Sequence, residues 1–235
     1  MSWRDRAKEV VARRAVDELV RDGMVVGLGS GSTAALAVRR LGERVREEGL
    51  DVLCVPTSYQ IAFLATQVGL KLTSLNEHPE PDVAIDGADQ VDGELNLIKG
   101  GGAALTCEKI VDFAARELAI IVDESKLARR LGENGVPVPI EVLPVALELV
   151  RRHLRRLGAT EARLREAGRG KVGPVVTDNG NLIIDAYFGP ISDPGALEAS
   201  IKELPGVVEV GLFVGMTDVL YVGARDGSVR KLTTS

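Results

Sequence analysis

The chain has 235 residues, 45% of them hydrophobic and 3% aromatic, and its formal net charge is −5. This length allows one large domain or two small ones, and the negative charge makes nucleic acid and anionic membranes poor electrostatic partners. The two cysteines, Cys54 and Cys107, lie far apart and form no CxxC motif, so we expect neither a disulfide framework nor a structural zinc site. No apolar run reaches the ~18 residues typical of a membrane span, and we expect a cytoplasmic protein.

Helical and strand-like segments alternate along the first part of the chain. Predicted helices cover residues 4–21, 33–47, 59–68 and 103–116. Predicted strands cover residues 24–28, 51–55, 70–72, 82–85, 95–98 and 118–122. Short apolar strands that alternate with helices are typical of an α/β fold with a Rossmann-like, doubly wound and mostly parallel sheet.

The pattern changes near residue 133. Prolines in the segment 135–144 favour a linker that runs into an edge strand. The segments that follow are a helix at 145–157, a strand at 159–165, a turn at 177–181, a strand at 182–187, a helix from 194 to 204 and a strand at 207–213. The order strand, helix, strand, strand, helix, strand is that of a ferredoxin-like βαββαβ domain.

The change of pattern divides the chain into two predicted domains. We expect a small ferredoxin-like α+β domain at residues 131–206. Residues 1–130 and 207–235 are expected to form the Rossmann-like domain, with a last strand at 218–224 followed by a hairpin turn.

Small, polar or charged residues follow many of the predicted strands. Ligands of doubly wound sheets bind beyond the carboxyl ends of the strands, so these residues are the candidates for a site. The strand ends in question are residues 29–33, 56–58, 86–89, 99–102 and 123–126.

The first of these strand ends, loop 29–33, is a glycine-rich turn into a helix. Its residues Ser30, Gly31, Ser32 and Thr33 offer amides and hydroxyls to an anion, and the helix dipole favours a negative charge there. Glycines at 27, 29 and 31 do not fit the GxGxxG dinucleotide fingerprint, so a phosphate monoester is the better hypothesis. The alternative is a tight turn that only packs helix on sheet.

A second glycine-rich segment, loop 99–102, follows another predicted strand. Lys99 supplies a positive charge, and Gly100, Gly101 and Gly102 allow a nest of backbone amides around an anion. The alternative is a flexible loop with a solvated lysine.

Two aspartates follow the predicted strand 82–85. Asp86 and Asp89 flank Gly87 and Ala88, and three roles compete for them: holding Mg²⁺, binding sugar hydroxyls as acid or base, or capping a turn. Because no third carboxylate completes a metal site, we favour hydroxyl binding and expect no metal.

Glu108 is the carboxylate best suited to act as a base. The helical neighbours Leu105, Val111 and Phe113 predict apolar surroundings, which would raise the pKa of Glu108 toward that of a general base. The alternative is a solvent-facing glutamate. Lys126, after the strand 118–122, is a candidate phosphate or oxyanion donor, or else a surface lysine.

Taken together, the motifs resemble the type A ribose-5-phosphate isomerases over essentially the whole chain. The motifs that carry the resemblance are, in order, GLGSGSTA, VPTS, DGAD, KGGGAALTCEKI, DESK and VVTDNGN. The resemblance implies a metal-independent and cofactor-independent aldose–ketose isomerase. It would interconvert ribose 5-phosphate and ribulose 5-phosphate in the non-oxidative pentose phosphate pathway, as a homodimer or homotetramer.

The resemblance also implies roles for single residues. Residues 30–33, loop 99–102 and Lys126 would bind the sugar phosphate. Asp86 and Asp89 would contact the sugar, the first during ring opening, and Glu108 would be the proton acceptor. Lys99 and nearby amides would stabilise the oxygen charge of an enediolate intermediate.

One residue departs from the family pattern, and the role of another is not assigned. Cys107 stands where many relatives carry a basic residue, which removes a charge beside Glu108. Lys8 on the first predicted helix is left unassigned, because its register with the phosphate loop is uncertain.

Other function classes stay open at this stage. A related amino-sugar phosphate isomerase would use a histidine, for which neither His78 nor His153 is well placed. A coenzyme A transferase would use a catalytic glutamate in a different context. A non-catalytic sugar-phosphate sensor that binds DNA needs a helix-turn-helix and a basic face, for which the short N-terminal helix and the net charge of −5 leave no room.

Overall fold

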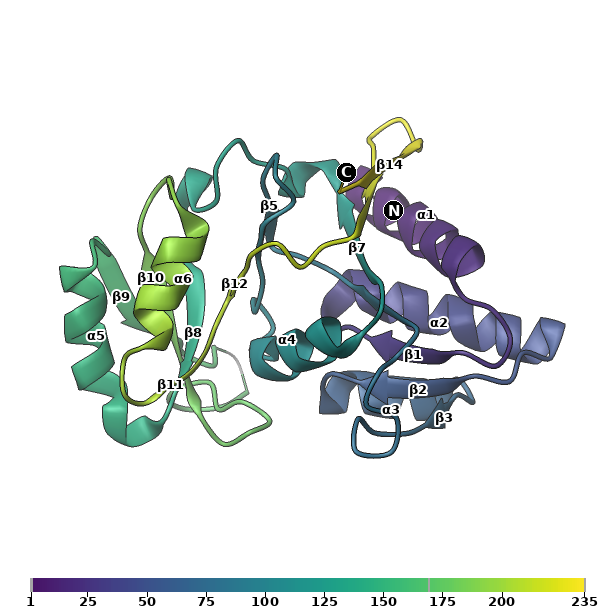
Figure 1. Ribbon diagram of the computed structural model, residues 1–235, viewed down its shortest axis with the longest axis horizontal. Helices are drawn as coiled ribbons and strands as arrows, with labels where there is room; N and C mark the ends of the chain where they lie inside the picture. Colours follow the sequence, from purple (N-terminus) through teal and green to yellow (C-terminus); the bar gives the residue numbers. More distant parts are fainter. Residues whose placement is uncertain (1, 169, 235) are drawn as a thin grey trace. The chain divides into compact units, whose positions relative to one another are not determined.

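The computed structural model describes residues 2–168 and 170–234, and these fall into two units (Figure 1). Unit 1 comprises the chain up to Ala88, Cys107–Lys126 and the chain from Met216 onward. Unit 2 comprises Asp89–Thr106 and Leu127–Gly215. Unit 2 therefore takes in residues 89–106, 127–130 and 207–215, which lie outside the predicted range 131–206.

Unit 1 is built on a sheet with strand order β14-β13-β7-β4-β1-β2-β3. Its strands are β1 Val25–Leu28, β2 Leu53–Pro56, β3 Lys71–Leu72, β4 Val83–Asp86, β7 Leu118–Asp123, β13 Val219–Gly223 and β14 Val229–Thr233. Neighbouring strands are parallel, apart from the antiparallel pair β13 and β14. The mostly parallel sheet confirms the Rossmann-like prediction.

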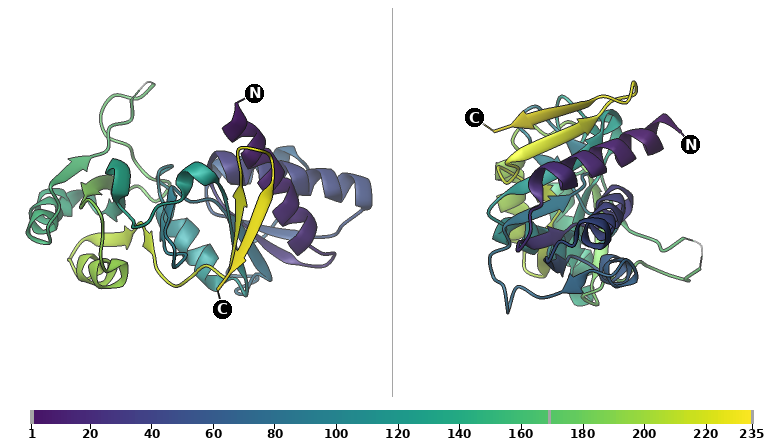
Figure 2. Two further views of the ribbon diagram at one scale, coloured as in Figure 1. Left: turned by 90° about the horizontal axis from the view of Figure 1, so that it is seen from above. Right: turned by 90° about the vertical axis from the view of Figure 1, so that its right-hand side faces the viewer.

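Helices cover both faces of this sheet. They are α1 Trp3–Leu19, α2 Gly31–Glu48, α3 Tyr59–Gln67 and α4 Leu105–Ala114, with the 3₁₀ turn η1 Glu124–Lys126 after β7. Val26 and Leu28 of β1 pack into one core with residues of α1, α2 and α3. Gly27 points to the other face, where a Cβ atom would lie 2.8 Å from the side chain of Val111 on α4. Figure 2 shows β13 and β14 lying beside α1.

Unit 2 contains an antiparallel sheet with strand order β11-β8-β10-β9. Its elements are β8 Val138–Val142, η3 Pro144–Ala146, α5 Leu147–Arg156, β9 Glu161–Leu164, β10 Leu182–Tyr187, α6 Pro194–Lys202 and β11 Val207–Val210, preceded by the turn η2 Glu133–Gly135. This chain order with this strand order is the split βαβ arrangement of ferredoxin-like domains, as predicted.

The two faces of this small sheet differ in chemistry. Ile140 of β8 and Ile184 of β10 pack with Val150 of α5 and Ile201 of α6 in an apolar core. Because side chains alternate along a strand, Glu141 points to the opposite face. The face opposite α5 and α6 is therefore polar, and there Thr106 of α4 donates from Oγ1 to Glu141 Oε2 at 2.5 Å.

The prediction of a linker and edge strand at residues 135–144 is wrong, because β8 lies between β11 and β10. Proline is tolerated in this inner strand because of where β11 stops. The carbonyl of Pro139 accepts a hydrogen bond from the Gly211 amide at 2.7 Å, beyond the last paired residue of β11, Val210. The ring nitrogen of Pro139 thus faces a position where the regular ladder has ended.

The predicted strand 207–213 is divided between two sheets. Its second part, β12 Leu212–Phe213, joins β6 Leu97–Ile98 and β5 Gln90–Val91 in a short antiparallel sheet with order β12-β6-β5. Gly211 separates the two parts, and a Cβ atom there would lie 2.4 Å from the Lys99 carbonyl oxygen. None of the helices in the described ranges has the length and apolar character needed to cross a membrane.

Candidate active site

The order of strands in unit 1 marks one place in the sheet for ligand binding. From β1 the chain continues to β2 and β3 on one side, whereas β4 lies on the other side of β1 and is followed by β7. The loops after β1 and β4 therefore flank the topological switch point, where doubly wound sheets bind their ligands. Loop 29–33 and Asp86 are the residues at these two strand ends.

Asp86 is packed against loop 29–33. The side chain is fully buried, and its Oδ1 atom accepts hydrogen bonds from the amides of Ser30 (3.1 Å) and Gly87 (2.6 Å). A Cβ atom on Gly29 would lie 2.0 Å from the same oxygen. Glycine at position 29 is thus required by the close approach of a carboxylate, and the loop and Asp86 form one fixed structure.

Hydroxyl groups hold the start of α2 in place. Ser30 Oγ lies 2.7 Å from Thr57 Oγ1 and donates to Ser58 Oγ at 2.6 Å. The Gly31 amide donates to Gln60 Oε1 at 3.2 Å. No local signal assigns a role to Thr57 or Ser58 at the polar end of the second predicted strand, because their partnership with Ser30 depends on the pairing of β1 with β2.

Two lysines of unit 1 lie on elements beside these loops. Lys8 on α1 donates from Nζ to Ser32 Oγ at 3.2 Å. This contact settles the register that the sequence left open, because it places a positive charge at the first turn of α2. Lys126 ends η1, which follows β7, the strand paired with β4. The lysines, the amides and the hydroxyls make this end of the sheet suited to an anion.

In unit 2, loop 99–102 is held together with Asp89. The Gly101 amide donates to Asp89 Oδ2 at 2.7 Å, and Gly100 has a φ of +102°, a conformation that favours glycine. The side chain of Lys99 is 2% exposed, and its Nζ atom lies 5.3 Å from the centroid of the Phe213 ring. Such a position combines a buried positive charge with a cation–π contact.

Glu108 lies in the first turn of α4, in the part of the helix that belongs to unit 1, and is 5% exposed. Val111 is buried as expected, but Phe113 is 81% exposed, so the prediction that Phe113 shields Glu108 is wrong. Phe113 lies on the outer face of α4, as does the half-exposed Ile110. Glu108 is thus buried although Phe113 is not.

The predicted site residues are distributed over both units. Unit 1 holds residues 30–33, Asp86, Gly87, Ala88, Glu108 and Lys126. Unit 2 holds Asp89 and loop 99–102.

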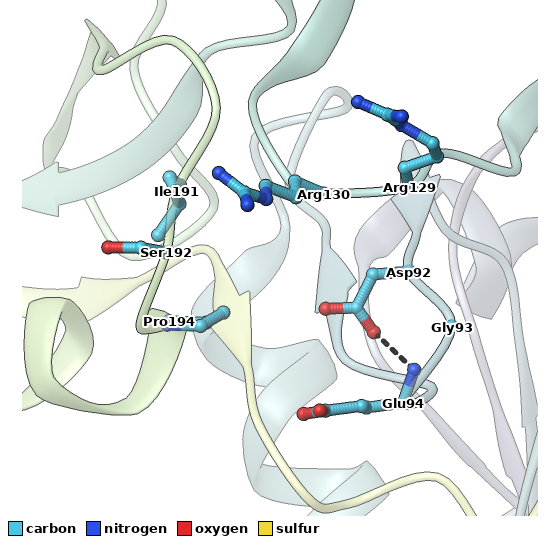
Figure 3. A pocket seen from close by; sticks show the side chains of 8 residues that line it. All are labelled: Asp92, Gly93, Glu94, Arg129, Arg130, Ile191, Ser192 and Pro194. Carbon is cyan, nitrogen blue, oxygen red and sulfur yellow. Dashed lines mark hydrogen bonds between the residues drawn. The ribbon is translucent and has the colours of Figure 1, made fainter.

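Unit 2 also contains a cavity of about 250 Å³ (Figure 3). Its lining consists of Asp92, Gly93, Glu94, Arg129, Arg130, Ile191, Ser192 and Pro194. The carboxylate of Asp92 is engaged there by the Glu94 amide at 2.9 Å. None of the predicted site residues described in the structure is among the lining residues.

Among residues 2–168 and 170–234, no group of three or more His, Cys, Asp or Glu side chains could hold a metal ion. The two histidines make local contacts instead. Nδ1 of His78 lies 2.8 Å from Thr73 Oγ1, and Nδ1 of His153 lies 2.9 Å from the Leu149 carbonyl oxygen.

Known proteins of one family match this chain over most of its length. The family model of ribose 5-phosphate isomerase A (phosphoriboisomerase A) matches residues 53–227. A ribose-5-phosphate isomerase A from Methanothermobacter thermautotrophicus is 56% identical over 220 residues, which cover 94% of this chain and 95% of the relative.

Solved structures show the same fold. The ribose 5-phosphate isomerase A structure from Methanocaldococcus jannaschii superposes with a TM-score of 0.92 at 49% identity, covering 98% of this chain and 99% of that chain. A D-ribose-5-phosphate isomerase in complex with phospho-erythronic acid gives a TM-score of 0.93 at 44% identity, with the same coverage. On the strength of the family match and the sequence identity, this chain belongs to the ribose 5-phosphate isomerase A family.

Proposed function

We propose that this protein is an aldose–ketose isomerase that interconverts D-ribose 5-phosphate and D-ribulose 5-phosphate by proton transfer through an enediolate. The observation that carries the proposal is an alignment with a ribose-5-phosphate isomerase A over 94% of the chain. The chain also keeps a nearly buried carboxylate, Glu108, in the helix that follows loop 99–102. The sensor, the amino-sugar phosphate isomerase and the transferase considered above are not favoured.

The phosphate group is assigned to loop 29–33. The amides and hydroxyls of Ser32 and Thr33 are donors, and the helix dipole adds a partial positive charge. Ser30 and Gly31 hold the loop in place through Ser58 and Gln60. Lys8, 3.2 Å from Ser32 Oγ, and Lys126 add full charges. Binding energy from this remote group helps to hold the reacting carbons in place.

The proton transfer is assigned to Glu108. Its carboxylate takes the proton from one carbon of the C1–C2 pair and returns it to the other, as a general base and then acid. Lys99 and nearby backbone amides of loop 99–102 stabilise the negative oxygen of the enediolate, while the Gly101 amide holds Asp89.

The sugar hydroxyls are assigned to the segment that joins the two units covalently. Asp86 and Asp89, with the backbone of Gly87 and Ala88, orient the hydroxyls, and Asp86 assists ring opening. The buried position of Asp86 and its two amide donors supply the fixed geometry that such a role needs. The relative solved with phospho-erythronic acid supports a ligand that joins a phosphate to a sugar-acid chain.

The test follows ketose formation from ribose 5-phosphate for the wild type and for Glu108→Gln. Loss of the base is expected to lower kcat about a thousandfold and to leave KM little changed. Glu47→Gln, the same change on the exposed part of α2, is the control and retains wild-type turnover. Near-normal turnover of Glu108→Gln would remove Glu108 from the mechanism.

We further propose that the enzyme works without metal or cofactor, as a cytoplasmic homodimer or homotetramer of the non-oxidative pentose phosphate pathway. Excess EDTA is expected to leave activity unchanged, whereas loss and recovery with a divalent ion contradicts the mechanism. The exposed aromatic side chains of Tyr59 and Phe63 on α3 support assembly, since such surfaces commonly become buried between subunits. Light scattering after size exclusion gives the assembly state.

A further inference from the structure

We propose that Arg165, oriented by Asp185, is a positioning residue that sets the conformation of loop 99–102 and, through it, the direction of the Asp89 carboxylate. The inference rests on the proposed function, which gives this loop its catalytic role. The polar face of the small sheet, which has no other part in the proposed mechanism, thereby gains a role.

The guanidinium of Arg165 is shared between a carboxylate and the loop. Nε donates to Asp185 Oδ2 at 2.8 Å, and Nη2 donates to Asp185 Oδ1. The third nitrogen, Nη1, donates to the carbonyl oxygens of Gly100 at 2.8 Å and Gly101 at 3.1 Å. Both charged side chains are 15% exposed, so the planar fork is held in one orientation.

The same loop peptides face Asp89 on their other side. The Gly101 amide donates to Asp89 Oδ2 at 2.7 Å, and a Cβ atom on Gly101 would lie 2.7 Å from Asp89 Oδ1. Glycine peptides rotate easily, because no side chain restricts φ and ψ. With the carbonyl of Gly100 held by Arg165, the amide of Gly101, which belongs to the same planar peptide unit, stays directed at Asp89. Without Arg165 this restraint is lost.

The location of the ion pair agrees with this task. Asp185 lies between Ile184 and Ala186 of β10, which both belong to the core formed with α5 and α6. Asp185 therefore points to the face opposite α5 and α6, as Arg165 must to reach it.

Unit 1 contains a second arginine with the same pattern of donation. Arg44 donates from Nε and Nη2 to Glu48, and from Nη1 to the carbonyl oxygens of Val16 and Val20, each at 3.0 Å. These carbonyls belong to the end of α1 and no proposed site residue is among the partners. Arg44 is thus a matched control, because it donates in the same pattern but joins only α1 to α2.

The experiment compares Arg165→Lys and Arg165→Met with Arg44→Lys and Arg44→Met. Both kcat and KM are measured well below each variant's melting temperature. Misplacement of catalytic groups by a fraction of a bond length costs rate rather than binding, so we expect kcat about 100-fold lower for Arg165→Met and about tenfold lower for Arg165→Lys. KM should change by about twofold at most, and the Arg44 variants should lose melting temperature while kcat is retained.

Two results would overturn the inference. One is a kcat of Arg165→Met close to that of the wild type. The other is an equal loss of kcat in the Arg44 and Arg165 variants with the same loss of melting temperature, which would make the effect one of stability. If Arg165→Met does not fold, Arg165→Lys and Asp185→Asn answer the same question.

Failure of the proposed function is recognised separately, by absence of isomerase activity in the wild type. Amide hydrogen exchange then decides the inference without any substrate. Arg165→Lys should speed exchange at Gly101 relative to the wild type, and Arg44→Lys should not. Unchanged exchange at Gly101 in Arg165→Lys contradicts the positioning role.

Discussion

The two glycine-rich loops reach a fixed geometry in different ways. Loop 29–33 runs from the end of β1 into the first turn of α2, and its neighbours are the next strand ends of the same parallel sheet. Loop 99–102 follows the two-residue strand β6 and is held by Arg165, 65 positions from Gly100 along the chain. Regular secondary structure fixes the first loop, whereas a distant ion pair restrains the second.

The difference has a consequence for mutations. A change in loop 29–33 meets a rigid frame of strands and a buried carboxylate, so it has little room to relax. A substitution in loop 99–102 can be accommodated in part by rotation of the glycine peptides. We therefore expect larger losses from the first loop than from the second.

The strongest test of this difference is Gly29→Ala. Its Cβ atom would lie 2.0 Å from Asp86 Oδ1, so the aspartate or the loop must move. We expect kcat/KM to fall about 100-fold and the melting temperature to drop. Gly93→Ala is the control, since a Cβ atom there meets nothing within 4 Å. Wild-type kinetics in Gly29→Ala would show that loop 29–33 is not rigid.

The matching change in the second loop is Gly101→Ala. Its Cβ atom would lie 2.7 Å from Asp89 Oδ1, a conflict that a small rotation of the carboxylate relieves. We expect kcat about tenfold lower, and a smaller loss of melting temperature than in Gly29→Ala. If Gly101→Ala proves more damaging than Gly29→Ala, the contrast between the loops is reversed.

Lys8→Met tests how far α1 contributes to the first loop. Removal of the charge beside Ser32 is expected to raise KM for ribose 5-phosphate about threefold to tenfold, with kcat nearly unchanged, because phosphate binding weakens. The effect should diminish as salt is added. Lys71→Met, which breaks the exposed ion pair with Asp51, serves as control. A fall in kcat without a rise in KM would contradict a phosphate-binding role.

The smallest expected effect comes from Tyr221→Phe, which touches neither loop. The Tyr221 hydroxyl donates to Glu18 Oε2 at 2.8 Å and thereby holds the pKa of Glu18 below its ordinary value of 4.5. We expect the variant to lose about 1 kcal/mol of unfolding free energy at neutral pH and to keep its kcat.

The pH dependence of that loss has a definite sign. A carboxylate with a lowered folded-state pKa contributes stability above its unfolded pKa and loses it as pH falls through the folded value. The stability difference between wild type and Tyr221→Phe should therefore narrow below about pH 4.5. Denaturant titrations at neutral and acidic pH measure it, and a constant difference would mean that Glu18 is not the partner that matters.

Much of the fold could be predicted from the sequence because its elements have local signals. The strand 182–187 was placed at the bounds of β10, and the helix ends of unit 1 differ from prediction by a few residues. The failures have non-local causes. Pro139 is tolerated in an inner strand because β11 stops beside it, and Gly211 divides the strand 207–213 because two carbonyls approach it.

In the candidate site, too, residues with local signals could be predicted and residues with non-local contacts could not. Residues at the ends of strands could be nominated from the pattern alone, since topology brings strand ends to one edge. Lys8, Thr57 and Ser58 could not be placed in the same way, because their contacts depend on how α1 and β2 pack beside loop 29–33. Arg165 carries no local signal, because its partners are fixed by strand pairing and by the loop path.

The position of β13 has a consequence for synthesis of the chain. β13 pairs with β7, yet the segment Leu127–Gly215 separates the two strands in the sequence. All residues of β7 are buried in the finished sheet. During synthesis, the edge of β7 that later pairs with β13 stays unpaired until the intervening segment has been made. We expect the nascent chain to be most prone to aggregation, and most dependent on chaperones, in this interval.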